Sequence, residues 1–189
     1  WASDYRRLSQ GFQRSTGESL RSGIRVMVLA AVTFHEVYGL SLNIRDIDAT
    51  YTLGAMAQKR RQAIDRLTRE GLIDLNKAIA FPLVPQRVAV ISSPTAAGYG
   101  DLFHQLDTNA YGYKIAHTLF PAVMQGEEAE RSVAAALRAI AQERQQYDVV
   151  AIIRGGGSAV DLHCFDSYEL GAQVARFALP VITGIGHEK

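Results

Sequence analysis

Residues 148–158 read DVVAIIRGGGS, and this stretch combines a short apolar run with a glycine-rich turn. The run at 149–153 is apolar throughout, mostly β-branched and too short for a helix, which is typical of a strand buried on both faces in a parallel sheet. Arg154 and three glycines follow directly. Because glycine lets the backbone approach a ligand closely, such a loop can present N–H groups and a guanidinium to an anion. The alternative interpretation is a tight turn with an exposed arginine.

The composition is that of a soluble globular protein, with 48% hydrophobic and 21% charged residues in a chain of 189. No apolar stretch approaches the roughly 18 residues that span a bilayer, and the start WASDYRRLSQGF lacks the apolar core of a secretory signal. The single cysteine, Cys164, excludes an internal disulfide and fits a reducing compartment, so we expect a cytoplasmic location. A first residue other than methionine indicates a section of a longer protein.

Charge is distributed unevenly along the chain, although the net charge is only +1. Residues 1–87 carry 13 Lys and Arg against 8 Asp and Glu, whereas residues 88–189 carry 7 against 11. A basic first half favours contact with a polyanion such as nucleic acid. A modest excess of positive charge is also common on protein surfaces, so the charge alone leaves both interpretations open.

The first half of the chain predicts a β-hairpin. Residues 24–34 are rich in β-branched and apolar side chains, and residues 40–47 alternate apolar and polar positions after a turn at Tyr38 and Gly39. Two strands do not form a stable sheet alone. We therefore expect residues 1–52 to be the end of a small β domain.

A helical period follows over residues 53–70, and Gly71 is well placed to end that helix. Two prolines within residues 74–86 indicate a linker. The helix carries cationic side chains that could contact DNA phosphates, although a solvated helix face explains them nearly as well. These candidate DNA-binding residues are Lys59, Arg60, Arg61 and Arg66.

From residue 87 onward, strand and helix patterns alternate, which predicts an α/β fold with a doubly wound, mainly parallel sheet of about four strands. In such sheets, ligands bind at the carboxyl ends of the strands, where the strand order switches. The segments SSPTAAGYGD, RGGGS and GIGHE each follow a strand and are rich in Gly, Ser and polar residues, which favours one shared site. The strands are expected at 87–92, 113–120, 148–153 and 180–183, and the helices end near 106, 145 and 177.

The segments SSPTAAGYGD, FPAVMQG, IIRGGGSAVDLHCFD and PVITGIGHE together resemble the catalytic domain of the exodeoxyribonuclease VII large subunit, in that family's order and spacing. Residues 53–86 resemble the family's connector, and residues 24–52 resemble the end of its N-terminal OB-fold. The resemblance implies a partial, nucleic-acid-binding OB-fold at 1–52, a helical connector at 53–86 and an α/β catalytic domain at 87–189. It also implies exonucleolytic hydrolysis of single-stranded DNA to 5′-phosphate-ended products, with small subunits as partners.

The resemblance assigns catalytic positions to Asp101, Arg154 and His187. Asp101 is expected to orient or deprotonate water, and Arg154 to clamp the phosphate. His187 would donate a proton to the leaving 3′ oxygen or hold the phosphate as a cation. The respective structural alternatives are a carboxylate at a helix start, a salt bridge and a packed histidine. Further candidates for phosphate contacts are Gly155, Gly156, Gly157, Ser158, Ser93 and Thr95.

The sequence contains no metal or cofactor motif. The remaining histidines show no ligand spacing, so we expect no structural metal and no required cofactor. A divalent cation such as Mg²⁺ is nevertheless compatible with the site, because Asp101 could hold one.

Two other functions stay open from the residues themselves. One is a doubly wound phosphate- or nucleotide-binding enzyme that uses RGGGS. The other is a single-stranded DNA-binding module without nuclease activity, with aromatic stacking candidates at Phe34, Tyr38 and Tyr51.

The family pattern usually continues past residue 188 with a Thr and then an Asp, whereas this chain has Lys189 and ends. We expect the first OB strands, and the C-terminal helical region where the small subunits attach, to be absent from this chain. This section of the protein is then expected to fold without being a competent exonuclease.

Overall fold

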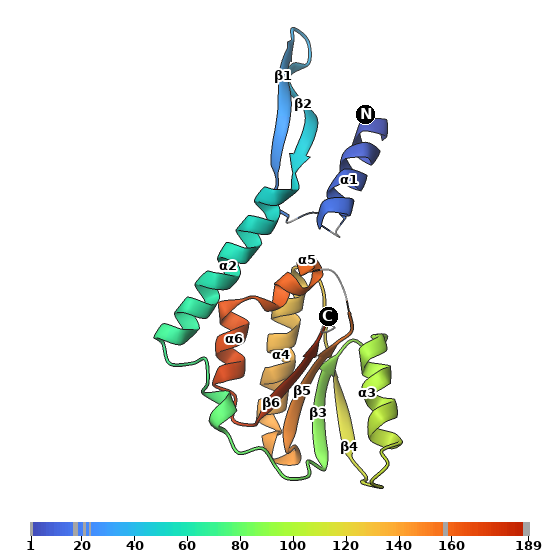
Figure 1. Ribbon diagram of the computed structural model, residues 1–189, viewed down its shortest axis with the longest axis vertical. Helices are drawn as coiled ribbons and strands as arrows, with labels where there is room; N and C mark the ends of the chain where they lie inside the picture. The colour runs from blue at the N-terminus through green and yellow to red at the C-terminus, as the bar shows by residue number, and fades with distance from the viewer. Residues whose placement is uncertain (1, 17–18, 21, 23, 157–158, 187–189) are drawn as a thin grey trace. The chain divides into compact units, whose positions relative to one another are not determined.

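A computed structural model (Figure 1) describes residues 2–16, 19–20, 22, 24–156 and 159–186. The chain forms two compact units, one made of residues 1–59 with 158–161 and the other of residues 60–157 with 162–189. Within the described ranges, no helix is both long enough and apolar enough to cross a membrane.

The first unit is built around the hairpin, which confirms that prediction. β1 (Met27–His35) pairs antiparallel with β2 (Gly39–Asp48), and Gly39 turns the chain between them with a φ of +71°. The register pairs Val32 with Leu42 and Phe34 with Leu40, so these side chains share one face of the hairpin. Each of the four is between 59% and 73% exposed. The hairpin therefore presents an uncovered apolar face.

Two helices flank the hairpin in the sequence. In α1 (Ala2–Thr16), Phe12 is buried, and the Arg7 guanidinium donates a hydrogen bond of 3.1 Å to the Arg45 carbonyl of β2. The second helix, α2 (Ala49–Arg69), begins directly after β2. It begins there because the Asp48 carboxylate accepts hydrogen bonds from the N–H groups of Thr50 and Tyr51, which have no partner within the helix.

The second unit holds a four-stranded, all-parallel sheet, which confirms the predicted α/β fold. The strand order is β4–β3–β5–β6, with β3 at Arg87–Ser92, β4 at Ala116–Pro121, β5 at Val149–Arg154 and β6 at Val181–Ile185. Every residue of β5 is buried, as expected for the apolar run at its position inside the sheet.

Helices cover both faces of this sheet. α3 (Ala97–Asp107) packs on one face through Tyr99 and Leu102, while α4 (Glu128–Gln142) and α6 (Tyr168–Ala175) cover the other (Figure 1). The sheet is thus doubly wound. Short helical segments complete the chain: η1 (Asn76–Ala78), η2 (Arg144–Gln146), α5 (Ala159–Leu162) and η3 (His163–Phe165).

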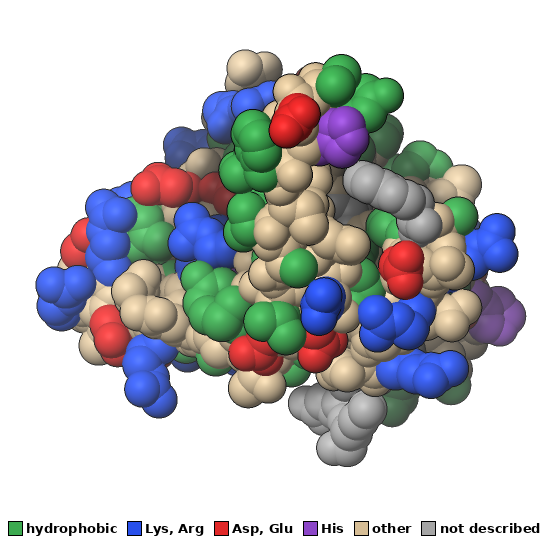
Figure 2. Space-filling view, turned by 90° about the horizontal axis from the view of Figure 1, so that it is seen from above, with side chains coloured by type: hydrophobic (Ala, Val, Ile, Leu, Met, Phe, Trp, Pro, Cys, Tyr) green, Lys and Arg blue, Asp and Glu red, His purple; other side chains and the backbone are tan. Residues whose placement is uncertain are grey.

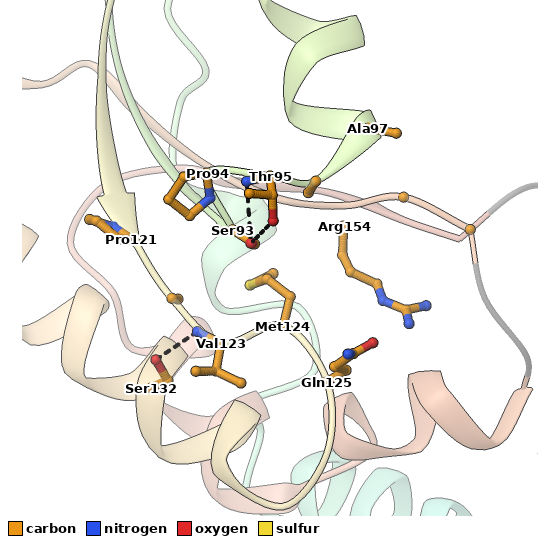
Figure 3. Close-up of a pocket in the computed structure, with 14 residues that line it drawn as sticks. Ser93, Pro94, Thr95, Ala97, Pro121, Val123, Met124, Gln125, Ser132 and Arg154 are labelled. Atoms are coloured by element: carbon orange, nitrogen blue, oxygen red, sulfur yellow. Dashed lines mark hydrogen bonds between the residues drawn. The ribbon is translucent and has the colours of Figure 1, made fainter. Parts of the chain in front are cut away.

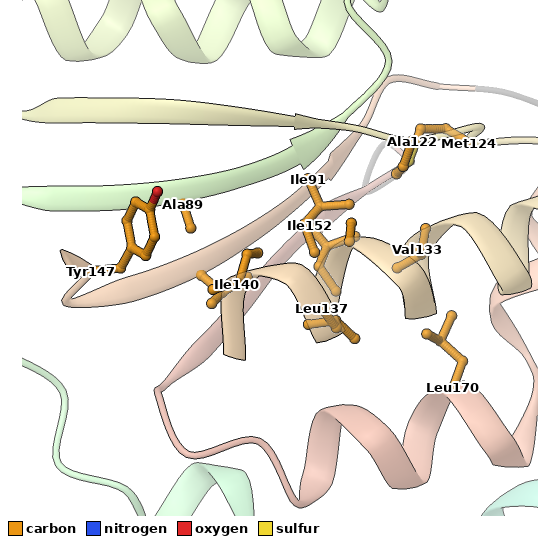
Figure 4. Packing of buried hydrophobic residues seen from close by; sticks show 12 residues of the cluster. Ala89, Ile91, Ala122, Met124, Val133, Leu137, Ile140, Tyr147, Ile152 and Leu170 are labelled. Atoms are coloured by element: carbon orange, nitrogen blue, oxygen red, sulfur yellow. The ribbon is translucent and has the colours of Figure 1, made fainter. Parts of the chain in front are cut away.

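α4 supplies a large part of the core on its side of the sheet. Val133, Leu137 and Ile140 recur at helical spacing, and each is at most 2% exposed. Figure 4 shows them beside Ile91 and Ile152 of the two central strands. Burial of side chains of this size stabilises the fold by roughly 1.5–3 kcal/mol each. The position of α4, and of the loop that leads into it from β4, is fixed by this packing.

The strand order switches between β3 and β5. The chain leaves β3 toward α3 on one face and leaves β5 toward α6 on the other, so the two neighbouring loops diverge. The Ser92 hydroxyl donates a hydrogen bond of 2.7 Å to the Ile153 carbonyl and joins the two strand ends. Doubly wound sheets bind ligands at such a point.

The C-terminal part of α2 is attached to α6 within the second unit. The Arg66 guanidinium carbon lies 3.5 Å from the centroid of the Tyr168 ring, and the Tyr168 hydroxyl donates a hydrogen bond to Glu70. Two hydrogen bonds to the Glu70 carboxylate hold its pKa below the usual value. The bond from Tyr168 has the larger effect and the bond from Arg66 the next largest. Leu67 lies so close to Gly171 that a Cβ on this glycine would be 3.0 Å from the leucine Cδ1.

Gly71 ends α2, as the sequence predicts. Its φ is +69°, and the next N–H, from Leu72, donates to the Leu67 carbonyl at 2.8 Å. This is the bonding pattern of a glycine-terminated helix.

Asn76 connects the segment after α2 to the entry of β6. Its side-chain amide donates to the carbonyls of Phe177 and Leu179 at 3.2 and 3.0 Å and accepts from the Val181 N–H at 2.9 Å. We expect Asn76→Ala to lower the free energy of unfolding by about 1–3 kcal/mol, because three backbone groups lose their partner. Lys77→Ala, at a side chain that is 74% exposed, should change it by less than about 0.5 kcal/mol. Equal urea midpoints for the two variants would contradict this role.

Asp148 ties the start of β3 to the start of β5. Its carboxylate accepts hydrogen bonds from the N–H groups of Gln86 and Arg87, each at 2.9 Å, and from the Arg87 guanidinium at 2.6 Å. The hydrogen bond from the Arg87 side chain is the main reason that the pKa of Asp148 lies below its usual value.

This lowered pKa predicts how stability depends on pH. The stabilisation is present above the unfolded-state pKa of about 3.9 and is lost as the pH falls through the lower folded-state value. Asp148→Asn should therefore be less stable than the parent protein near neutral pH, and this difference should shrink below about pH 4. Urea midpoints measured across the acid range test the prediction, with Asp74→Asn, at a side chain that is 75% exposed, as control. A difference that does not vary with pH would contradict it.

Candidate active site

A pocket of about 630 Å³ opens at the carboxyl ends of three parallel strands (Figure 3). Residues 93–97 after β3, residues 121–125 at the end of β4 and residues 154–156 at the end of β5 form its walls, together with Ser132 of α4. The pocket therefore lies at the switch in strand order, where the fold alone predicts a ligand site.

The first wall is the turn from β3 into α3. The hydroxyls of Ser93 and Thr95 lie 3.2 Å apart, and the Ala96 N–H donates to the Ser93 carbonyl at 3.0 Å. α3 begins at Ala97, and the preceding residue makes no side-chain cap. The Tyr99 N–H donates to the Ala96 carbonyl at 3.1 Å. The N–H groups of Ala97 and Gly98 have no acceptor within the helix, and together with the helix dipole they favour an anion beside the turn.

The second wall is the end of β5. Arg154 is the last residue of the strand and is only 7% exposed, although it lines the pocket. The next residue, Gly155, lies against Gly98 of α3: a Cβ on Gly98 would be 3.0 Å from the Gly155 nitrogen and 3.1 Å from its Cα. The absence of a side chain at Gly98 lets the start of α3 and the β5 loop close one side of the pocket together.

This contact predicts opposite effects for two glycines of the same helix. Gly98→Ala should destabilise the protein by about 1–3 kcal/mol, because the added methyl meets backbone atoms that cannot rotate away. Gly100→Ala, whose new Cβ would have no described atom within 4 Å apart from its chain neighbours and the nearby helix backbone, should stabilise it by about 0.5–1 kcal/mol through helix propensity. Urea unfolding of both variants measures the difference, and two shifts of the same sign would contradict the contact.

The third wall is the segment after β4. The Val123 N–H donates to the Ser132 hydroxyl at 2.9 Å, and Gly126 turns the chain into α4 with a φ of +76°. In Figure 3, the Arg154 guanidinium and the Gln125 amide are directed toward the same part of the pocket. Gln125 and Ser132 were not predicted as site residues. The motif FPAVMQG, which follows a strand as the other site segments do, was the signal for Gln125.

The structure brings several predicted site residues together in this pocket. They are Ser93, Thr95, Arg154, Gly155 and Gly156. Gly157, Ser158 and His187 lie outside the described residues. The third predicted segment lies beside Arg154, because the Gly186 N–H, directly after β6, donates to the Arg154 carbonyl at 3.3 Å. None of the described residues of that segment lines the pocket. The roles of all these residues stay predictions.

Asp101 does not line the pocket and is exposed on α3. It follows Ala97, a lining residue, by four positions, so the two lie on the same face of the helix. Helical Cα–Cβ bonds tilt toward the N-terminus. The Asp101 side chain therefore leans toward the pocket end of α3, one turn from the lining.

The predicted DNA-binding residues lie on α2, and two of them have partners in the second unit. Arg60 lies 3.7 Å from Asp166, and Arg66 is bonded to Glu70 at 3.0 Å and stacked on Tyr168. Figure 2 shows Lys and Arg side chains interspersed with Asp and Glu over the face of the molecule that it draws. Arg66 thus has a structural role in addition to any contact with DNA. The DNA contacts of Lys59, Arg60, Arg61 and Arg66 stay predictions.

Among the residues that the structure describes, no three His, Cys, Asp or Glu side chains form a group that could hold a metal ion. The polar groups at the pocket are hydroxyls, a side-chain amide, a guanidinium and backbone N–H groups. These groups suit the oxygens of a phosphate.

Comparison with known proteins gives the family. The family model described as "Exonuclease VII, large subunit" matches residues 72–189. The chain belongs to the exonuclease VII large-subunit family. The matched range includes every residue that lines the pocket, so the candidate active site lies in the part of the chain that the family model matches.

Individual relatives in the exonuclease VII large-subunit family agree with this match. The chain is 35% identical over 195 residues to the exodeoxyribonuclease 7 large subunit of Deinococcus radiodurans, covering 100% of this chain and 46% of the relative. It is 37% identical over 138 residues to that of a Nostoc species, covering 72% and 32%. The corresponding protein of Lactobacillus delbrueckii subsp. bulgaricus is 33% identical over 166 residues, covering 88% and 36%. The chain thus spans less than half the length of these relatives.

Proposed function

We propose that this chain carries the phosphodiester-hydrolysing site of an exodeoxyribonuclease VII large subunit. In the complete enzyme, this site would degrade single-stranded DNA exonucleolytically to 5′-phosphate-ended products. The observation that carries the proposal is the convergence of Arg154, two glycine amides and two hydroxyls on one pocket at the switch in strand order. Family membership supports the same reading.

The pocket suits the phosphate of a DNA strand. Arg154 would bind two phosphate oxygens through its planar guanidinium and neutralise the charge that builds up on them during hydrolysis. The N–H groups of Gly155 and Gly156 and the hydroxyls of Ser93 and Thr95 would bind the same oxygens from the opposite walls. Burial of Arg154 strengthens its interaction with the phosphate, because water screens it less.

Proton transfer would fall to Asp101 and His187. Asp101, one turn along α3, would orient and deprotonate the attacking water, or would hold a divalent cation such as Mg²⁺ that activates it. His187 follows β6, whose end is bonded to Arg154. It would protonate the leaving 3′ oxygen or hold the phosphate as a cation, since the pKa of histidine lies near neutrality.

The cations of α2 would contact the strand outside the pocket. Arg61 and Lys59 are the members of that group for which the structure gives no ion pair among its described residues. Binding through such side chains weakens steeply with salt. Small subunits are the protein partners that this function implies.

Hydrolysis assays on the large subunit together with its small subunits test the proposal. Labelled single-stranded DNA should be degraded to products with 5′-phosphates, and double-stranded DNA should not. Parallel reactions with a chelator would show whether Asp101 acts with a cation. Products with 3′-phosphates would contradict the assigned bond cleavage. Tight binding without any hydrolysis would instead favour the DNA-binding module.

A further inference from the structure

A second pocket, of about 430 Å³, lies between α4 and α6 of the second unit. α4 runs from the carboxyl end of β4 toward the amino end of β5, and this pocket lies along its last turns. The pocket is therefore at the edge of the sheet opposite the candidate active site. Its size falls in the range of about 300–1,000 Å³ that is usual for small-molecule sites.

Of the residues that the structure describes, three arginines and no acidic residue line this pocket. Arg138 of α4 and Arg144, the first residue of η2 after that helix, are exposed, and neither forms an ion pair with any residue that the structure describes. Arg176, at the end of α6, lies 3.6 Å from Glu70, which restrains its position while its side chain stays 56% exposed. The pocket is consequently a concentration of positive charge.

The arginines surround an apolar floor. Leu137 and Ala172 are 2% and 3% exposed, Phe177 is partly buried, and the small residues Ala141 and Ala178 leave the centre of the pocket open. Arg144 and Arg176 lie just after the C-termini of α4 and α6, where the helix dipole favours cations. The dipole does not explain why the surface between them is apolar and hollow.

We propose that this pocket binds a nucleoside 5′-monophosphate, with the phosphate between the arginines and the base over the apolar floor. A phosphate monoester carries about −1.5 to −2 charges at neutral pH. Its charge therefore balances the positive charge of three guanidinium groups better than the charge of a single carboxylate would. A planar guanidinium can also bind two phosphate oxygens at once. A free nucleotide and the 5′-phosphorylated end of a DNA strand share this chemistry. The proposal rests on this pocket alone and does not depend on the proposed hydrolysis.

Titration of the 189-residue chain with deoxyadenosine 5′-monophosphate, followed by calorimetry and by NMR shifts, tests the proposal. The double variant Arg138→Gln/Arg144→Gln should bind the nucleotide about tenfold more weakly or worse, because two charge-assisted contacts are lost. Arg131→Gln is the matched control: Arg131 lies on the same helix as Arg138, is 80% exposed and pairs with Glu128. This control should bind like the parent protein. All three side chains are exposed, so the variants should keep the fold.

Titrations with other ligands, and with one further variant, show which parts of the nucleotide the pocket recognises. Deoxyadenosine and inorganic phosphate should each bind more weakly than the nucleotide, and Ala141→Glu should abolish binding by placing a carboxylate on the floor. A 5′-phosphorylated trinucleotide that binds more tightly than the mononucleotide would identify the strand end as the preferred form.

Three outcomes would overturn the proposal. One is equal affinity of the double variant and the control, which would place the nucleotide in the other pocket. The second is equal affinity for deoxyadenosine and its monophosphate. The third is the absence of binding when the nucleotide is present at millimolar concentration. This outcome includes the case in which a glutamate-rich peptide binds to the pocket and the nucleotide does not.

Discussion

Replacing Arg154 with lysine is expected to lower the rate of single-stranded DNA hydrolysis by about 100-fold or more. Lysine keeps the positive charge but lacks the planar fork that binds two phosphate oxygens. Arg154 is 7% exposed, at the end of a fully buried strand, so its direction into the pocket is set by the sheet. A shorter, more flexible ammonium group would not reach the same two oxygens.

Steady-state hydrolysis by the large subunit with its small subunits measures this effect, with circular dichroism to verify the fold. Arg131→Lys makes the same chemical change at an exposed position of α4, and the hydrolysis rate should stay at the parent value. A rate for Arg154→Lys within about twofold of the parent would contradict a bidentate clamp.

Asp101→Asn is expected to remove most of the hydrolysis, again by about 100-fold or more, while leaving DNA binding unchanged. The substitution keeps the shape of the side chain and removes only its charge and its ability to accept a proton. Because Asp101 is exposed, a change in stability would not account for the loss. Asp107→Asn, an exposed position in the last turn of the same helix, is the control.

Two further measurements separate the roles of Asp101. If it holds a divalent cation, excess Mg²⁺ should restore part of the activity of the asparagine variant, and a chelator should inhibit the parent enzyme. If it deprotonates water directly, the acidic limb of the pH–rate profile should disappear in the variant. Near-parent turnover of Asp101→Asn in all conditions would exclude both roles.

The elements of the second unit could be predicted from the sequence because β3 and β5 are compact apolar runs and helical patterns alternate with the strands. The observed starts of β4 and α2 differ from the predicted ones, and each difference has a local cause. The strand expected from residue 113 begins at Ala116, because the Asn109 side chain donates to the Leu106 and Tyr113 carbonyls and so holds the preceding residues in a loop. The helix expected from residue 53 begins at Ala49, because Asp48 caps it. Aspartate is a common N-cap residue, but Asp48 can be identified as the cap of α2 only when β2 is known to end at that position.

The candidate site was predictable only where its residues end a strand or come shortly after one. Arg154 ends β5, and Ser93 and Thr95 come after β3, so the rule for parallel sheets places them at one edge. Ser132 enters the pocket from α4 by way of its bond to the Val123 N–H, which depends on how β4 and α4 pack. Side-by-side placement of Gly98 and Gly155 likewise requires the three-dimensional fold, since 56 intervening residues separate them in the chain.

The pairing of β3 with β5 has a consequence for synthesis on the ribosome. β3 ends at residue 92, but its neighbour β5 is complete only at residue 154, after α3, β4 and α4 have been made. At about 5–20 residues per second, the nascent chain carries the apolar run of β3 for on the order of 3–12 s before this partner emerges. During that interval β4 is the only neighbour that the sheet offers it. Slow codons or a pause before residue 154 would therefore prolong the period in which a chaperone, or another unfinished chain, can bind this strand.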